Sequence, residues 1–196
     1  MSLLDQDAMF ESAHAALVFA FNISNQCFDR PPLARLAINP LPGSSRDGLS
    51  GLSGLDGAAQ AGMIRAEVHA LGGLPENLLI ARFAPRSHPC SCRSKCCSGK
   101  QYNMEWRNAI AWLANHVKES ALSGTHADYR VARSCVERHF QHREHRSSIA
   151  TFAISMSVHK NSAEAYIHRV SKLFKVVEST AYAMISDRLQ EINIVK

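Results

Sequence analysis

The chain has 196 residues, of which 46% are hydrophobic and 20% charged, the composition of a globular protein with a buried core. Its longest apolar run, residues 15–21, is far shorter than the roughly 20 residues that span a bilayer. The first residues, MSLLDQD, are acidic rather than basic, which argues against a secretory signal. We therefore expect a cytoplasmic protein with no membrane partner.

The net charge of +5 is unevenly distributed along the chain. Residues 1–85 contain five Lys/Arg and eight Asp/Glu, whereas residues 86–196 contain 17 Lys/Arg and nine Asp/Glu. Eight of the ten histidines also lie in the second part. A basic half joined to an acidic half favours a polyanionic partner, most simply nucleic acid. A solvated basic surface without a partner explains the charge equally well.

The first predicted region, residues 1–85, is helical and acidic. Apolar residues at helical spacing predict a first helix over residues 8–21. Prolines and glycines interrupt regular structure in residues 29–45. The glycine repeat at residues 48–57 is interpreted as a loop rather than a phosphate-binding loop, because no Lys-Ser/Thr pair follows it. Two further helices are expected in this region, at residues 58–71 and 76–84.

A cysteine-rich loop, residues 86–100, forms the second predicted region, and four of the chain's six cysteines fall within eight of its residues. Thiolates suit the four tetrahedral positions of zinc, and neighbouring Lys and Arg favour the thiolate form. The predicted ligands of a structural Zn²⁺ are the four thiols, with His88 as a substitute: Cys90, Cys92, Cys96 and Cys97. A redox-sensing thiol cluster and unliganded cysteines are the alternatives.

The predicted zinc site has a structural rather than a catalytic role, because no Asp or Glu lies inside the cluster to act as a general base. The loop has almost no apolar residues and cannot build a core, so metal bonds would fix how the acidic half joins the basic half. No nucleophile motif, paired-carboxylate site or nucleotide loop occurs elsewhere in the sequence. An enzyme is therefore not expected.

The third predicted region, residues 101–196, is a basic helical domain. Apolar residues at helical spacing predict helices over residues 104–122 and 126–140, the second with Cys135 as a buried small hydrophobe. No segment alternates with a period of two over a sustained length. The expected fold class is therefore mainly α, with a zinc-binding loop and a C-terminal helix-turn-helix.

The helix-turn-helix is predicted at about residues 147–175, SSIATFAISMSVHKNSAEAYIHRVSKLFK. Such a motif needs small or apolar residues where its two helices touch, and a small residue in its tight turn. Ser157 takes the turn position, where glycine is commonest. The suitable inner residues are Phe152, Ala153, Met156, Val158, Ala163 and Tyr166. An ordinary helical hairpin in a helical core is the alternative.

The outward face of the second helix supplies the predicted DNA-binding residues. Asn161 can read adenine through two hydrogen bonds, and Lys160 can reach guanine or a phosphate. Three cations further along the helix suit phosphates. The whole outward set is His159, Lys160, Asn161, Glu164, Ala165, His168, Arg169, Lys172 and Lys175.

This second helix is expected to continue nearly to the end of the chain, because an apolar stripe runs through it. The stripe consists of Val170, Leu173, Phe174, Val177, Ala181, Met184, Ile185, Leu189 and Ile192. It can be buried against the helices at residues 104–140, which gives a monomer, or against a second copy, which gives a homodimer.

The run from ARFAP through PCSCRSKCCSG to EWRNAIAWL, followed by the terminal helix-turn-helix, resembles a group of small phage and prophage DNA-binding regulators. The later stretch AYIHRVSKLFKVVESTAYAMISDRL is similar in layout to the antiterminator Q proteins of lambdoid phages. Those carry a helix-turn-helix related to the promoter-reading region 4 of sigma factors, and some also contain a zinc-binding module. The first resemblance covers most of the chain, and the second covers about residues 145–190.

The resemblance implies a late-gene regulator that acts in a bacterial host cell. Such a protein binds double-stranded DNA near a promoter, engages paused RNA polymerase and makes it resistant to terminators. We therefore expect a sequence-specific transcription regulator of phage origin, in its sharpest form a Q-type antitermination factor. The alternative is a DNA-processing or packaging adaptor, such as a small terminase-like subunit or a recombination accessory protein.

Overall fold

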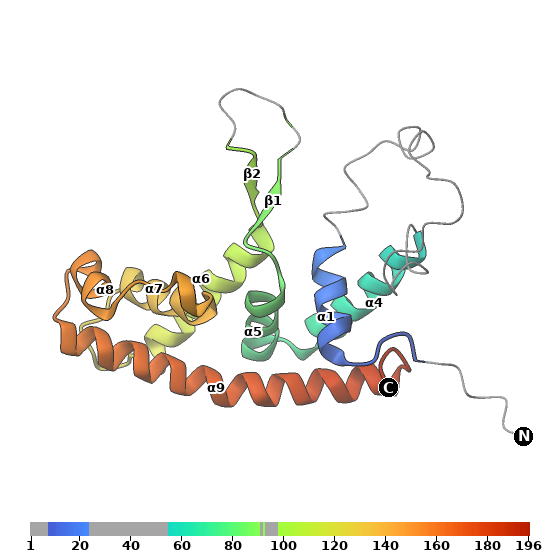
Figure 1. The fold of residues 1–196 in the computed structure, drawn as a ribbon. Coiled ribbons are helices and arrows are strands. Elements are labelled where there is room, and N and C mark those ends of the chain that lie inside the picture. Colours follow the sequence, from blue (N-terminus) through green and yellow to red (C-terminus); the bar gives the residue numbers. More distant parts are fainter. Residues whose placement is uncertain (1–7, 24–54, 91, 93–97) are drawn as a thin grey trace, which may run out of the picture. The chain divides into compact units, whose positions relative to one another are not determined.

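The structure, a computed structural model, describes residues 8–23, 55–90, 92 and 98–196 (Figure 1). Within them the chain is mainly helical, which confirms the expected fold class at that level. The interruptions expected at residues 29–45 lie outside the described residues. The chain divides into two compact units. Unit 1 comprises Met1–Ala70, Pro85–Asn103 and Ser186–Lys196, and unit 2 comprises Leu71–Ala84 and Met104–Ile185.

Unit 1 is built from helix α1 (Ala13–Asn22), nearly all of helix α4 (Leu55–Leu71), a short ribbon and the end of helix α9. Ser12 caps α1 by accepting a hydrogen bond of 3.3 Å from the amide of Ala15. Helix α9 (Lys160–Glu191) reaches this unit with its last turns. The side chains that form the core of unit 1 are fully buried: Leu17, Phe21, Ile64, Val68 and Leu189.

The two ends of the chain's described part meet within unit 1. The amide of Phe10 donates to the carbonyl of Ile194 at 2.9 Å, and the amide of Lys196 donates to the carbonyl of Phe10 at 3.2 Å. Arg188 and Glu67 form an ion pair at 3.4 Å, which links the end of α9 to α4. These bonds join residues from the beginning and the end of the chain in the core of unit 1.

Strands β1 (Ser87–Pro89) and β2 (Lys100–Tyr102) form an antiparallel ribbon in unit 1, with His88 opposite Gln101. At its base, Asn103 donates from its side chain to the carbonyl of Pro85 at 2.8 Å and from its amide to Arg86. The sequence did not predict this ribbon, because three-residue strands are too short to show a period of two. It occupies both ends of the expected cysteine-rich loop.

Unit 2 begins with helix α5 (Gly73–Phe83), which packs on helix α6 (Met104–Glu119). The two helices expected at residues 58–71 and 76–84 are separate elements, α4 and α5, and Gly72 between them adopts a positive φ of 62°. The indole of Trp106 donates to the carbonyl of Ala81 at 3.2 Å, so its buried N–H is satisfied. The core of α6 repeats at helical spacing, as expected: Trp106, Ile110, Leu113 and Val117.

Helix α7 (Tyr129–Phe140) packs on α6 and is capped by the carboxylate of Asp128, which accepts from Val131 at 2.8 Å. A short 3₁₀ helix η1 (Arg143–His145) and helix α8 (Ile149–Met156) follow. The thiol of Cys135 is only 2% exposed, and burial raises its pKa to about 12. It therefore behaves as the small buried hydrophobe that the sequence predicts.

The apolar stripe of α9 is largely buried, as the sequence predicts for a helix of this length. Within unit 2 the ring of Phe174 lies 5.1 Å from that of His139 and 5.7 Å from that of Phe140, both on α7. The buried members of the stripe are Val170, Phe174, Ala181, Ile185 and Leu189. Met184 and Ile192, expected to be part of the stripe, are 40% and 38% exposed.

An ionic cluster joins three helices of unit 2. Glu178 of α9 accepts a hydrogen bond of 3.1 Å from Nε of Arg82 on α5, and its other oxygen lies 3.5 Å from Nε2 of His139 on α7. Burial of the Glu178 carboxylate raises its pKa, but the interactions with His139 and Arg82 outweigh burial, so the pKa is lowered overall. The guanidinium of Arg82 also lies over the ring of Phe140, at 5.1 Å.

Replacing Glu178 by glutamine is expected to lower the free energy of unfolding by about 0.5–1.5 kcal/mol at neutral pH, since its ion pair with Arg82 is lost in a partly exposed site. Because the folded-state pKa lies below the ordinary value of 4.5, the stabilisation is complete above that pH. It is lost as the pH falls through the lower folded-state pKa. Urea unfolding over a pH series measures this, with Glu164→Gln as control; equal pH dependence in both variants would contradict it.

Candidate nucleic-acid interface

Helices α8 and α9 are joined by a three-residue turn, and we call residues 148–175 the α8–α9 corner. The hydroxyl of Ser148 caps α8 by accepting from the amide of Thr151 at 3.0 Å. At the other end Ser157 takes a left-handed conformation, with φ 57° and ψ 39°. The chain is therefore sharply redirected between two helices.

Two nested backbone hydrogen bonds close the end of α8. The amide of Ser157 donates to the carbonyl of Ile154 at 3.1 Å, and the amide of Val158 donates to that of Ala153 at 3.0 Å. This is the pattern of a helix that ends in a left-handed residue, usually glycine. Ser157 therefore lies where the sequence placed the turn.

Helix α9 starts at Lys160, three residues after Ser157. The backbone carbonyl of His159 accepts from the backbone N–H of Ala163 at 2.9 Å. The ring Nδ1 of His159 accepts from the backbone N–H of Asn161 at 3.3 Å. His159 was expected only as a DNA-binding residue. The structure shows that its ring also caps the first turn of α9, a role that histidine rarely signals in a sequence.

Helix α7 holds the corner in place through its arginines. Arg130 donates to the carbonyl of Met156 at 3.3 Å, at the end of α8. Arg138 donates to the carbonyl of Ser147 at 2.6 Å, just before α8, and its guanidinium lies 5.9 Å from the ring centre of Phe152. Both ends of α8 are thus tied to α7, which sequence reasoning had no signal to find.

The inner residues expected for the corner face the helical core. Phe152, Ala153 and Ala163 are 6%, 5% and 0% exposed. The other three inner residues are half-buried: Met156, Val158 and Tyr166. The buried part of the corner thus consists of one aromatic ring and two alanines.

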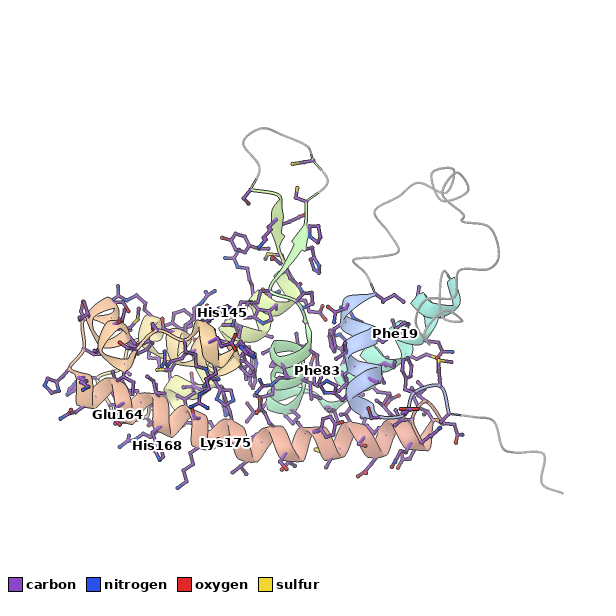
Figure 2. All side chains as sticks on the ribbon, viewed as in Figure 1. Phe19, Phe83, His145, Glu164, His168 and Lys175 are labelled. Carbon is purple, nitrogen blue, oxygen red and sulfur yellow. The ribbon has the colours of Figure 1, made fainter. Side chains whose placement is uncertain are left out.

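The predicted outward residues are exposed without exception: His159, Lys160, Asn161, Glu164, Ala165, His168, Arg169, Lys172 and Lys175. Figure 2 shows Glu164, His168 and Lys175 along the outer side of α9. Among the residues that the structure describes, no ion pair engages the four cations of this set. Their charge is therefore available to an external partner.

Helical spacing divides the outward residues into two groups. Asn161, Glu164 and His168 are separated by three and four residues and share one face of α9, which we call the reading ridge. Lys175, seven residues after His168, continues the same face. Arg169 is turned by about 100° from His168 and borders a pocket at the end of α6. The sequence placed all of them on one face, whereas the helix separates Arg169 from the ridge.

The predicted metal ligands are only partly within the described residues. His88 lies in β1 and is half-buried, as is Cys90, whose amide donates to Gly99 at 2.9 Å; Cys92 is exposed. Cys96 and Cys97 lie outside the described residues. In the part of the chain that the structure describes, no group of three or more His, Cys, Asp or Glu could hold a metal ion. The zinc site stays a prediction, and the ribbon brings the two ends of its loop together.

Comparison with known proteins yields no match to a family model, to a curated protein or to a solved structure. The helices within the described ranges include none that is long and apolar enough to cross a membrane. The interface is therefore argued from its own geometry.

Replacing Ser157 by glycine is expected to raise the free energy of unfolding by about 0.5–1 kcal/mol, because glycine adopts the left-handed conformation without a Cβ penalty. The matched control is Ala183→Gly, in the exposed middle of α9, which should cost about 1 kcal/mol. Urea unfolding measures both. If Ser157→Gly destabilised the protein as much as the control does, the turn would not have the conformation described.

Proposed function

We propose that the protein is a sequence-specific regulator of transcription that binds double-stranded DNA through the α8–α9 corner. In this proposal the corner is a helix-turn-helix and α9 is its recognition helix. The observation that carries the proposal is the left-handed turn at Ser157 between a short packed helix and a long helix whose outer face is exposed and positively charged.

The first turns of α9 have the shape and chemistry that a major groove accepts. The groove is about 12 Å wide and admits one α-helix, whose N-terminal residues reach the base edges. Asn161 and Lys160 occupy that position and are exposed. The side-chain amide of Asn161 can pair with adenine, and the ammonium group of Lys160 can donate to guanine or to a phosphate.

The cations further along α9 supply affinity rather than sequence preference. Lys172 and Lys175 follow the reading ridge by one and two turns, and Arg169 flanks it. Contacts from such side chains to phosphates release counterions and orient the helix on the duplex, but they do not distinguish bases. The surplus of positive charge in the second half of the chain fits this role.

The sharper form of the proposal rests on resemblance. The similarity to phage regulators and to lambdoid Q proteins supports a Q-type antitermination factor, with a helix-turn-helix like region 4 of sigma factors. Such a factor would act on bacterial RNA polymerase at a late promoter in the cytoplasm of the host cell. Readthrough of a terminator placed downstream of that promoter tests this form separately from DNA binding.

Structural zinc is the remaining part of the proposal, with Cys90, Cys92, Cys96 and Cys97 as ligands and His88 as a substitute. The ribbon supports it, because the paired strands hold the two ends of the cysteine loop close together. Bound zinc would close that loop and stabilise a segment with almost no apolar side chains.

Replacing Asn161 by alanine is expected to weaken binding to a duplex selected from random sequence by about 1–3 kcal/mol, while binding to unrelated duplexes is unchanged. Lys175→Ala, on the same face, should instead weaken all duplexes alike and reduce the slope of log affinity against log salt by about 1. Fluorescence anisotropy over a salt series separates the two. Full sequence preference in Asn161→Ala would show that α9 does not read the bases.

Purified protein is expected to contain about one zinc ion per chain, and replacing the four clustered cysteines by serine should remove it. Metal analysis after gel filtration measures this. Cys135→Ala is the matched control, because that thiol is buried in unit 2 and should leave the zinc content unchanged. Zinc retained by the four-serine protein would rule out these ligands.

A further inference from the structure

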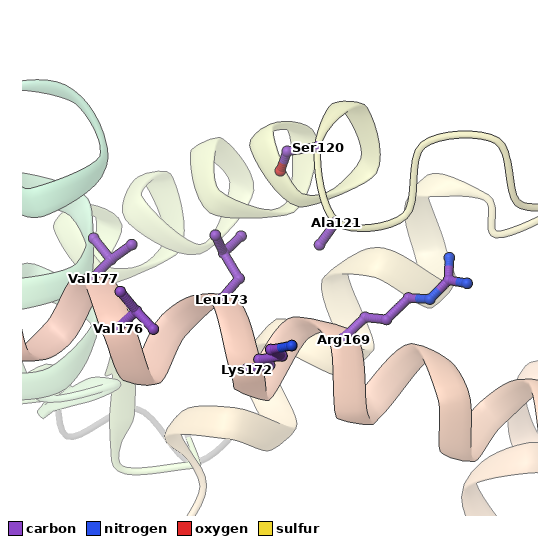
Figure 3. Close-up of a pocket in the computed structure, with 7 residues that line it drawn as sticks. All are labelled: Ser120, Ala121, Arg169, Lys172, Leu173, Val176 and Val177. Carbon is purple, nitrogen blue, oxygen red and sulfur yellow. The ribbon is translucent and has the colours of Figure 1, made fainter.

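Unit 2 contains a groove that the DNA-binding proposal leaves unexplained. Its volume is about 560 Å³, and it lies between the end of α6 and the middle of α9. Figure 3 shows Arg169 and Lys172 toward one end of the groove and two valines toward the other. The residues that line it are Ser120, Ala121, Arg169, Lys172, Leu173, Val176 and Val177.

The floor and wall of the groove are apolar and partly exposed. Val176 is 67% exposed, and Leu173 and Val177 are half-buried. On α6, Trp112 is 39% exposed and its ring stacks on that of His116, at 5.4 Å between centres. Trp112 and His116 are four residues apart and share one face of α6, and Ser120 follows directly after the helix, with its amide bonded to the carbonyl of His116 at 2.9 Å. This aromatic surface therefore leads towards the groove.

The groove also has a charge polarity. Arg169 and Lys172 are the two charged residues among those that line it, and both are positive. Neither takes part in an ion pair within the described ranges. An occupant that covers the valines and presents carboxylates to the two cations would match both properties.

The groove faces a different direction from the reading ridge. Val176 is eight residues after His168, which turns it about 80° around the helix axis, on the same side as Arg169. A duplex seated on the ridge would offer phosphates to the cations but no apolar surface to Val176 and Leu173. DNA alone is therefore a poor match for the groove.

We propose that the groove between α6 and α9 docks a short amphipathic helix of a partner protein, with apolar residues at i, i+3 or i+4 and i+7 and carboxylates at one end. Grooves between helices recognise such segments by anchoring their apolar face. A second copy of the same groove would set Arg169 and Lys172 against identical cations, which disfavours it. The proposal concerns unit 2 alone and does not depend on DNA binding.

The test selects peptides of about 16 residues, which form between four and five helical turns, from a random display library against the full-length protein. The selected peptides are expected to carry acidic residues beside helically spaced apolar ones. Their binding, measured by fluorescence anisotropy, should weaken at least about tenfold on Val176→Asp. Ile154→Asp is the matched control, because Ile154 of α8 is 80% exposed, and it should leave peptide binding unchanged.

Further measurements distinguish a partner helix from other molecules that could fill the groove. Lysine in place of the acidic residues of a selected peptide should also weaken binding about tenfold. A selection without acidic-apolar peptides, or peptides that bind Val176→Asp as tightly as the parent protein, would overturn the proposal. So would light scattering that shows a dimer converted to a monomer by Val176→Asp.

The same variants separate this proposal from the proposed function. Val176→Asp should keep the parent protein's preference for the selected duplex over unrelated duplexes, with circular dichroism as the check that it is folded. Asn161→Ala should bind the peptides normally while it loses sequence preference. A variant that loses peptide binding alone is therefore damaged in the groove. A variant that loses duplex recognition alone is damaged in the reading ridge.

Discussion

The left-handed conformation of Ser157 is the constraint on which the candidate interface depends. It ends α8 and lets two nested hydrogen bonds satisfy carbonyls of the last turn of that helix. Helix α9 then begins three residues later. If α8 continued past this point, Val158 and Ala163 could not return to the core. The outward position of Lys160 and Asn161 is thus a consequence of one backbone conformation.

A second constraint fixes the rotation of α9 about its own axis. Val170 and Phe174 are fully buried, and the rings of His139 and Phe140 lie against Phe174. The ionic cluster of Arg82, Glu178 and His139 holds the same face of α9 to α5 and α7. Since one side of the helix is buried, the sides left to solvent are determined. The reading ridge and the groove beside the end of α6 lie on two of those sides.

These constraints explain how one helix can present two separate surfaces. The ridge is polar and charged, as a partner with phosphates and base edges requires. The groove combines exposed valine with two cations, which suits the apolar face and carboxylates of a protein segment. A regulator of the proposed kind would need both kinds of contact, because DNA binding would place it on the template and a protein contact would let it act there. The length of α9 provides room for both.

The sequence by itself determined the helices, the turn and the outward set, because apolar spacing and a small turn residue are local properties. Only the tertiary structure showed that Arg130 and Arg138 tie both ends of α8 to α7, that Arg169 borders a groove beside the end of α6, and that β1 pairs with β2. Hydrogen bonds between residues far apart in the chain leave no periodic trace. The direction in which Arg169 leaves α9 becomes significant because the end of α6 lies beside it. Which element lies beside α9 depends on how the whole of unit 2 packs.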